Sequence, residues 1–62
     1  MCESTVYVLK EGKAEPIVED VDVLEYNEGQ IRMVSVFGEE RIIKARVKVL
    51  SLVDHKIILE PL

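Results

Sequence analysis

The sequence predicts an all-β protein, built as a small, strongly bent antiparallel sheet or barrel of about six short strands. Three observations predict this class. Segments of about six residues are rich in β-branched and aromatic side chains, and glycine-containing turn sequences separate them. No segment combines a helix cap with an apolar period of 3.6 residues. A chain of 62 residues is too short for a second core, so we expect a single domain spanning residues 1–62.

The first predicted strands form a hairpin. The run TVYVLK, Thr5–Lys10, has the composition of a strand, and Glu11-Gly12-Lys13 supplies a short turn into a second strand, Ala14–Glu19. Pro16 cannot donate a ladder hydrogen bond, so we expect this second strand to be either an edge strand or an irregular one.

The central segment predicts two further strands. Val21–Tyr26 alternates acidic and apolar residues, and the shift of the alternation near Val23-Leu24 indicates a bulge or bend. Asn27-Glu28-Gly29 is a strong turn sequence. Gln30–Phe37 then follows as a strand, with one side formed by Ile31, Met33 and Ser35. We expect Met33 to be a core residue.

The last third of the chain completes the sheet. Gly38-Glu39 predicts a turn, and Val53-Asp54-His55 predicts the final reversal before Pro61 ends the last strand. The predicted strands are Glu40–Lys44 with its continuation Ala45–Leu52, and finally Lys56–Glu60.

The small size of the chain predicts self-association. A domain of this length buries only about 60% of its unfolded surface, so its core alone is barely sufficient. Small domains usually add disulfides, a structural metal or a partner subunit. A single cysteine excludes an intramolecular disulfide, and the four-ligand set of a structural zinc site is missing. We therefore predict a homodimer.

The charge balance argues against nucleic acid as a partner. Eight Lys and Arg residues face twelve Asp and Glu residues, for a net charge of −4, whereas nucleic-acid binding depends on neutralising phosphates. The three aromatic side chains, Tyr7, Tyr26 and Phe37, are a poor platform for stacking bases. The stretch Arg41–Lys48 is locally basic, so an RNA-binding barrel remains the alternative function.

Neither a signal peptide nor an apolar run of about 20 residues is present, which predicts a cytoplasmic protein without a membrane partner. No catalytic arrangement emerges, because His55 is the only histidine and nothing in the pattern orients a Cys-His pair. We therefore expect no enzymatic activity. The acidic cluster Glu19, Asp20 and Asp22 is interpreted either as a weak cation site or, more commonly for such clusters, as a solvated acidic turn.

Cys2 is the best functional clue. Within two residues the chain offers the Cys2 thiolate, the terminal amine and, if Met1 is retained, the Cys2 amide nitrogen. Neighbouring donors close five-membered chelate rings, and a planar N,S set suits Ni(II) or Cu(II). An isolated terminal cysteine is more often a spectator thiol, and the residues alone leave both interpretations open.

Four segments of the chain are informative together: Met1–Val8, Glu19–Val21, Val36–Glu39 and Leu52–Leu59. They resemble the CooT family, very small proteins of which some are linked to nickel delivery to carbon monoxide dehydrogenase. Other members are described only as RNA-binding proteins. The resemblance extends over essentially the whole chain, and the Met-Cys start is its most specific element.

The resemblance implies a homodimer of small β-barrel subunits, SH3-like or Sm-like, that binds Ni(II) as a nickel store or metallochaperone. It implies Cys2 as the essential ligand, joined by the main-chain amine of Met1 if that residue is retained. It further implies a metal-recipient enzyme, either of the carbon monoxide dehydrogenase type or of unknown identity.

Overall fold

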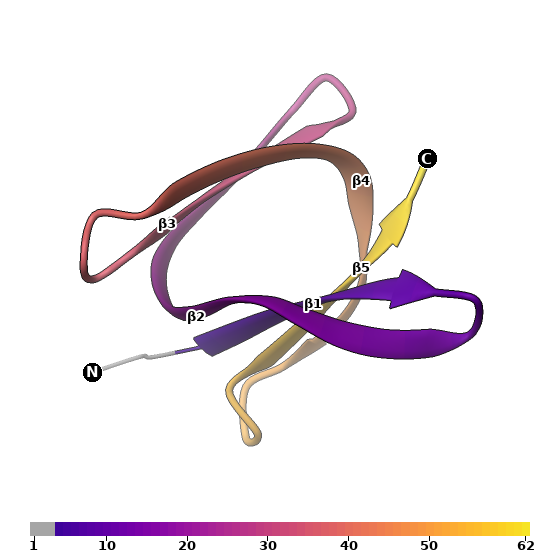
Figure 1. Cartoon of the computed structure of the whole chain (residues 1–62), viewed down its shortest axis with the longest axis horizontal. Helices are drawn as coiled ribbons and strands as arrows, with labels where there is room; N and C mark the ends of the chain where they lie inside the picture. The colour runs from indigo at the N-terminus through magenta and orange to yellow at the C-terminus, as the bar shows by residue number, and fades with distance from the viewer. Residues whose placement is uncertain (1–3) are drawn as a thin grey trace.

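The computed structural model describes residues 4–62, which form five strands closed into a single barrel (Figure 1). This confirms the predicted all-β class, and the described residues include no helix that could cross a membrane. The strands are β1 (Ser4–Lys10), β2 (Lys13–Asn27), β3 (Gln30–Ser35), β4 (Glu40–Ser51) and β5 (Lys56–Pro61).

Closure of the barrel comes from a parallel pair. Each strand runs antiparallel to the next in the chain, and β1 then pairs with β5 in parallel, from Thr5 opposite Lys56 to Val8 opposite Leu59. An odd number of alternating strands requires this, because the first and fifth strands point the same way. The final strand therefore has neighbours on both sides and offers no open edge along this pairing.

The strand count is five because the segments Ala14–Glu19 and Val21–Tyr26 join into β2. Three register shifts lie along this strand. Two occur in its pairing with β1, on either side of the pair Val6–Val18, and the third occurs in its pairing with β3, between Val21–Ser35 and Val23–Val34. The third shift lies just before the bulge predicted at Val23-Leu24. The bends allow one strand to pair first with β1 and then with β3, as Figure 1 shows.

Pro16 lies in the half of β2 that has one neighbour. It is opposite Tyr7 on β1, whereas the pairing of β2 with β3 begins only at Val21. A residue without an N–H group is tolerated at such a position, and the local edge agrees with the sequence-based expectation.

Two hairpins have two-residue turns in which both residues adopt positive φ. Glu11 and Gly12 have φ of 53° and 80°, and Glu28 and Gly29 have φ of 51° and 81°. This is the type I′ pattern, whose twist matches that of the flanking strands. Glycine adopts it freely, whereas a glutamate in the first position is strained.

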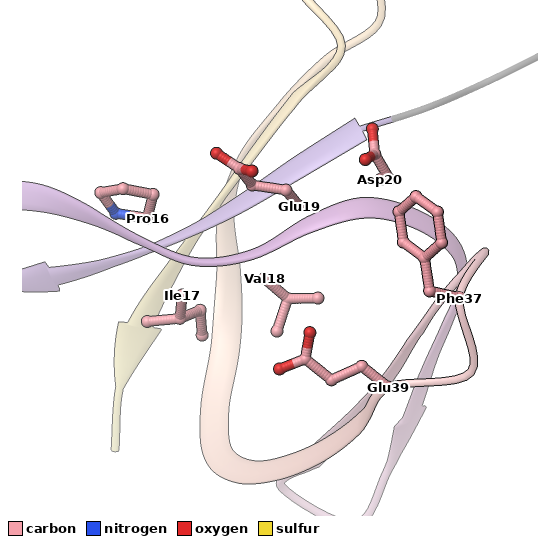
Figure 2. A pocket seen from close by; sticks show the side chains of 7 residues that line it. All are labelled: Pro16, Ile17, Val18, Glu19, Asp20, Phe37 and Glu39. Carbon is pink, nitrogen blue, oxygen red and sulfur yellow. The ribbon is translucent and has the colours of Figure 1, made fainter.

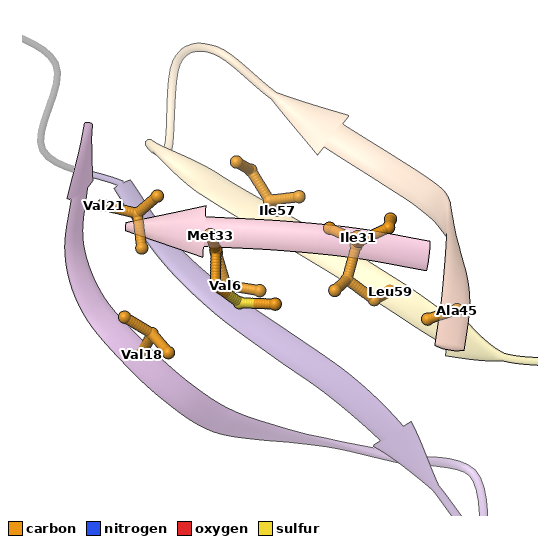
Figure 3. Packing of buried hydrophobic residues seen from close by; sticks show 8 residues of the cluster. All are labelled: Val6, Val18, Val21, Ile31, Met33, Ala45, Ile57 and Leu59. Atoms are coloured by element: carbon orange, nitrogen blue, oxygen red, sulfur yellow. The ribbon is translucent and has the colours of Figure 1, made fainter. Parts of the chain in front are cut away.

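The core lies inside the ring of strands (Figure 3). Met33 is fully buried, as predicted, and it shares the inward face of β3 with Ile31 and Ser35. Each strand contributes at least one side chain to the cluster, so no pair of strands has a core of its own. The buried apolar residues are Val6, Val18, Val21, Ile31, Met33, Ala45, Ile57 and Leu59.

Replacing Glu11 by Asn is expected to stabilise the barrel by up to about 1 kcal/mol, because Asn tolerates positive φ and favours type I′ turns. Urea denaturation followed by circular dichroism measures the change. Glu15→Asn is the matched control, since Glu15 lies within β2 and has no positive φ. A Glu11→Asn variant no more stable than the Glu15→Asn variant would contradict the turn assignment.

Candidate functional site

The predicted metal ligands, Cys2 and the main-chain amine of Met1, lie outside the described residues. The structure does describe the point to which they are joined. Ser4 is opposite Val21 on β2, and the N–H of Thr5 donates to the carbonyl of His55 at 3.0 Å. The start of β1 is therefore held on one side by the bend of β2 and on the other by the turn that precedes β5.

His55 lies in the predicted reversal between β4 and β5, with an exposed side chain and φ of 53°. The His55 carbonyl accepts the hydrogen bond from Thr5, so the imidazole is the group of this residue that could bind a metal. Among residues 4–62, no group of three or more His, Cys, Asp or Glu side chains is arranged to hold a metal. His55 is thus a single histidine beside the chain start.

The acidic cluster of Glu19, Asp20 and Asp22 belongs to a strand, which corrects the interpretation as an acidic turn. The three residues occupy the bend of β2, where Asp20 has φ of 56°. The Asp20 carbonyl accepts the N–H of Val36 at 2.8 Å. The backbone of this cluster therefore bends the strand and fixes the connection between β3 and β4.

Phe37 is in a turn, although the sequence predicts it at the end of a strand. β3 ends at Ser35, whose hydroxyl oxygen accepts the N–H groups of Phe37 and Glu39 at 3.2 and 3.1 Å. Two main-chain bonds complete the turn: Ser35 N–H donates to Glu39, and Gly38 N–H donates to Ser35. A buried serine thus holds a rigid loop in which the ring of Phe37 is 81% exposed.

A hollow of about 350 Å³ lies between this loop and β2 (Figure 2). Its walls combine apolar side chains with three carboxylates, and no basic side chain of residues 4–62 lines it. The lining residues are Pro16, Ile17, Val18, Glu19, Asp20, Phe37 and Glu39. The strand pattern alone predicts Phe37 within the sheet, not at a hollow. The local signal for the turn is Ser35, two residues before Phe37, together with Gly38 directly after it.

The basic stretch Arg41–Lys48 lies on β4 and is partly neutralised. The Arg46 guanidinium and the Lys48 ammonium lie 2.8 and 3.9 Å from the Glu60 carboxylate on the neighbouring strand β5. Because these two basic side chains pair with a carboxylate, their positive charge is less able to neutralise the phosphates of a nucleic acid. The RNA-binding alternative gains no support from this arrangement.

Arg32 forms a second cross-strand cluster on the outside of the barrel. It bonds to Glu40 on β4 and to Glu25 on β2, the latter at 2.8 Å. Hydrogen bonds to Glu40 and then Glu25 raise the pKa of Arg32 above its ordinary value. The cluster links β2, β3 and β4, and Arg32 is already paired with two carboxylates of its own chain.

Comparison with known proteins identifies one family. The sequence profile of CooT, described as a CO dehydrogenase accessory protein, matches residues 1–60. The crystal structure of a candidate CooT from Carboxydothermus hydrogenoformans superposes with a TM-score of 0.90. That protein is 38% identical in sequence, and the match covers 98% of each chain. No protein in a curated collection matches.

Replacing Ser35 by Ala is expected to destabilise the protein by about 1–3 kcal/mol, because the N–H groups of Phe37 and Glu39 lose their acceptor. Chemical denaturation measures the loss. Ser51→Ala is the matched control: the Ser51 hydroxyl accepts one exposed bond, from Asp54 at 3.3 Å, and its loss should cost less than about 0.5 kcal/mol. Equal losses in the two variants would refute the special role of Ser35.

Proposed function

The chain belongs to the CooT family, and from this premise we propose that it is a cytoplasmic nickel-binding protein that stores Ni(II) or delivers it to a recipient enzyme. The observation that carries the proposal is the family match over residues 1–60, which includes the Met1-Cys2 start. The description of the family as CO dehydrogenase accessory proteins supports a recipient of that type. The proposal includes no catalytic step.

The proposed ligands are the Cys2 thiolate and nearby main-chain nitrogens, including the Met1 amine if that residue is retained. A soft thiolate beside nitrogen donors favours late transition metals over Mg(II) or Ca(II). Metal binding then needs no preformed pocket in the barrel, because neighbouring donors along the chain close the chelate rings. The pairing of Ser4 with Val21 joins the segment that carries the proposed ligands to the barrel.

His55 is the obvious competitor for a role as ligand, since its carbonyl bonds to Thr5 near the chain start. Imidazole is a good ligand for nickel. The proposed main-chain and thiolate site does not require it. A variant at His55 therefore separates the proposed site from one that includes imidazole.

Cys2→Ser should lower nickel affinity by more than about 100-fold, beyond the 10- to 100-fold typical of losing an outer-shell partner. The fold should remain intact, because residue 2 precedes β1. The measurement is a Ni(II) titration of untagged protein, followed by thiolate-to-nickel charge-transfer absorption. An affinity unchanged by Cys2→Ser would refute the proposal.

The control for this titration is His55→Asn, because Asn accepts the positive φ at this position and lacks an imidazole. Its nickel affinity should remain within a small factor of the parent protein. A loss as large as that of Cys2→Ser would make His55 a ligand and replace the proposed donor set.

The proposed protein is a homodimer, and an exposed apolar surface supports this. Leu52 and Val53, in the turn after β4, are 78% and 90% exposed, and Leu50 at the end of that strand is also exposed. A small barrel with such a surface gains stability by covering it with a second copy. A symmetric dimer also allows two Cys2 residues to share one metal ion.

Leu52→Lys should convert the dimer to a monomer, because it places a charge in the proposed apolar interface. Light scattering over a range of protein concentrations measures the mass. Tyr26→Lys is the control, since Tyr26 is likewise exposed but lies on β2. The proposed interface is wrong if Leu52→Lys remains dimeric or if Tyr26→Lys dissociates equally.

A further inference from the structure

The hollow between β2 and the loop 36–39 has the features of a docking site. Its volume of about 350 Å³ is at the small end of the range of ligand pockets, roughly 300–1,000 Å³. It therefore suits a single side chain rather than a large ligand. The hollow is formed by residues 16–20 and the loop that contains Phe37, as Figure 2 shows.

The backbone that carries the aromatic wall of the hollow is fixed by hydrogen bonds within the chain. Phe37 exposes most of its ring, yet its backbone is held through the hydroxyl and main chain of Ser35. Val36 is tied in addition to the Asp20 carbonyl. A loop whose backbone is already fixed loses little backbone entropy on binding, and aromatic side chains contribute strongly to the energetics of interfaces.

The charge of the hollow is uniformly negative. Glu19, Asp20 and Glu39 line it, and none of the ion pairs formed within residues 4–62 uses these three carboxylates. Other acids, such as Glu60 and Glu25, have basic partners on neighbouring strands. The hollow thus combines unpaired negative charge with an exposed aromatic ring.

We propose that this hollow binds an arginine side chain presented by a basic segment of a partner protein. The guanidinium stacks on the Phe37 ring as a cation–π contact and donates hydrogen bonds to the neighbouring carboxylates. The aliphatic stem of the arginine packs on the apolar part of the lining, to which Ile17 contributes. Both halves of this side chain therefore have a complement in the hollow.

Other occupants fit less well. A bare metal ion gains nothing from the aromatic and aliphatic walls, and the described residues contain no converging group of three metal-ligating side chains. A phosphate or nucleic acid is repelled by three carboxylates. Lysine satisfies the charge but lacks the planar group that stacks and binds carboxylates bidentately.

The test uses a blocked arginine residue, N-acetyl-arginine N-methylamide, titrated into the intact protein and followed by two-dimensional NMR of backbone amides. We expect saturable binding in the millimolar range, with the largest shifts at Glu19, Phe37 and Glu39. The equivalent citrulline compound has nearly the same shape without the charge, and it should bind at least about fivefold more weakly.

Variants locate the site. Phe37→Ala should weaken arginine binding about fivefold, through loss of the cation–π contact, while the fold persists because the ring is exposed. Glu39→Gln, which is nearly isosteric, should weaken it as well. Tyr26→Ala removes an exposed ring elsewhere, on β2, and should leave binding unchanged.

The proposal is overturned if the citrulline compound binds equally well, if the shifts lie away from the hollow, or if Phe37→Ala leaves binding unchanged. Shifts at the hollow on dilution of the protein alone would assign it to a second copy of the chain and would also overturn it. The test is independent of nickel, since Cys2→Ser should bind arginine normally and Phe37→Ala should bind nickel normally.

Discussion

The parallel pairing of β1 with β5 is the contact on which the rest of the structure depends. Without it the five strands form a meander with two free edges, and the core side chains on the concave face remain open to water. With it, Val6 on the first strand and Ile57 on the last become direct neighbours. The same closure places Thr5 against His55 and fixes where the chain enters the barrel.

Closure of so small a barrel demands sharp bends, and these bends create the surface features. β2 turns at Asp20, in a left-handed conformation that an aspartate tolerates better than most residues. At that bend the Asp20 carbonyl accepts a hydrogen bond from the Val36 N–H, and the Ser35 hydroxyl oxygen accepts one from the Glu39 N–H. The exposed position of Phe37 is therefore a consequence of how β2 bends and β3 ends.

The bend of β2 also connects the two proposed activities. Asp20 lines the hollow, and its neighbour Val21 pairs with Ser4, the residue that leads toward the proposed nickel ligands. A partner protein whose arginine occupies the hollow is thereby held beside the start of β1. This placement would suit the proposed transfer of nickel, because the partner would lie close to the first described residue of the chain.

Local sequence determined the strand composition, the inward face of β3 and the hairpin turns, because alternation and turn chemistry act between neighbouring residues. The sequence by itself also supplied the Met1-Cys2 start, and its resemblance to the CooT family is confirmed by the matching profile. It did not determine that Ala14–Glu19 and Val21–Tyr26 form one bent strand, or that Phe37 leaves the sheet. Those features, and the gathering of Glu19, Asp20 and Glu39 around one hollow, depend on register and closure between distant segments, which only the tertiary structure decided.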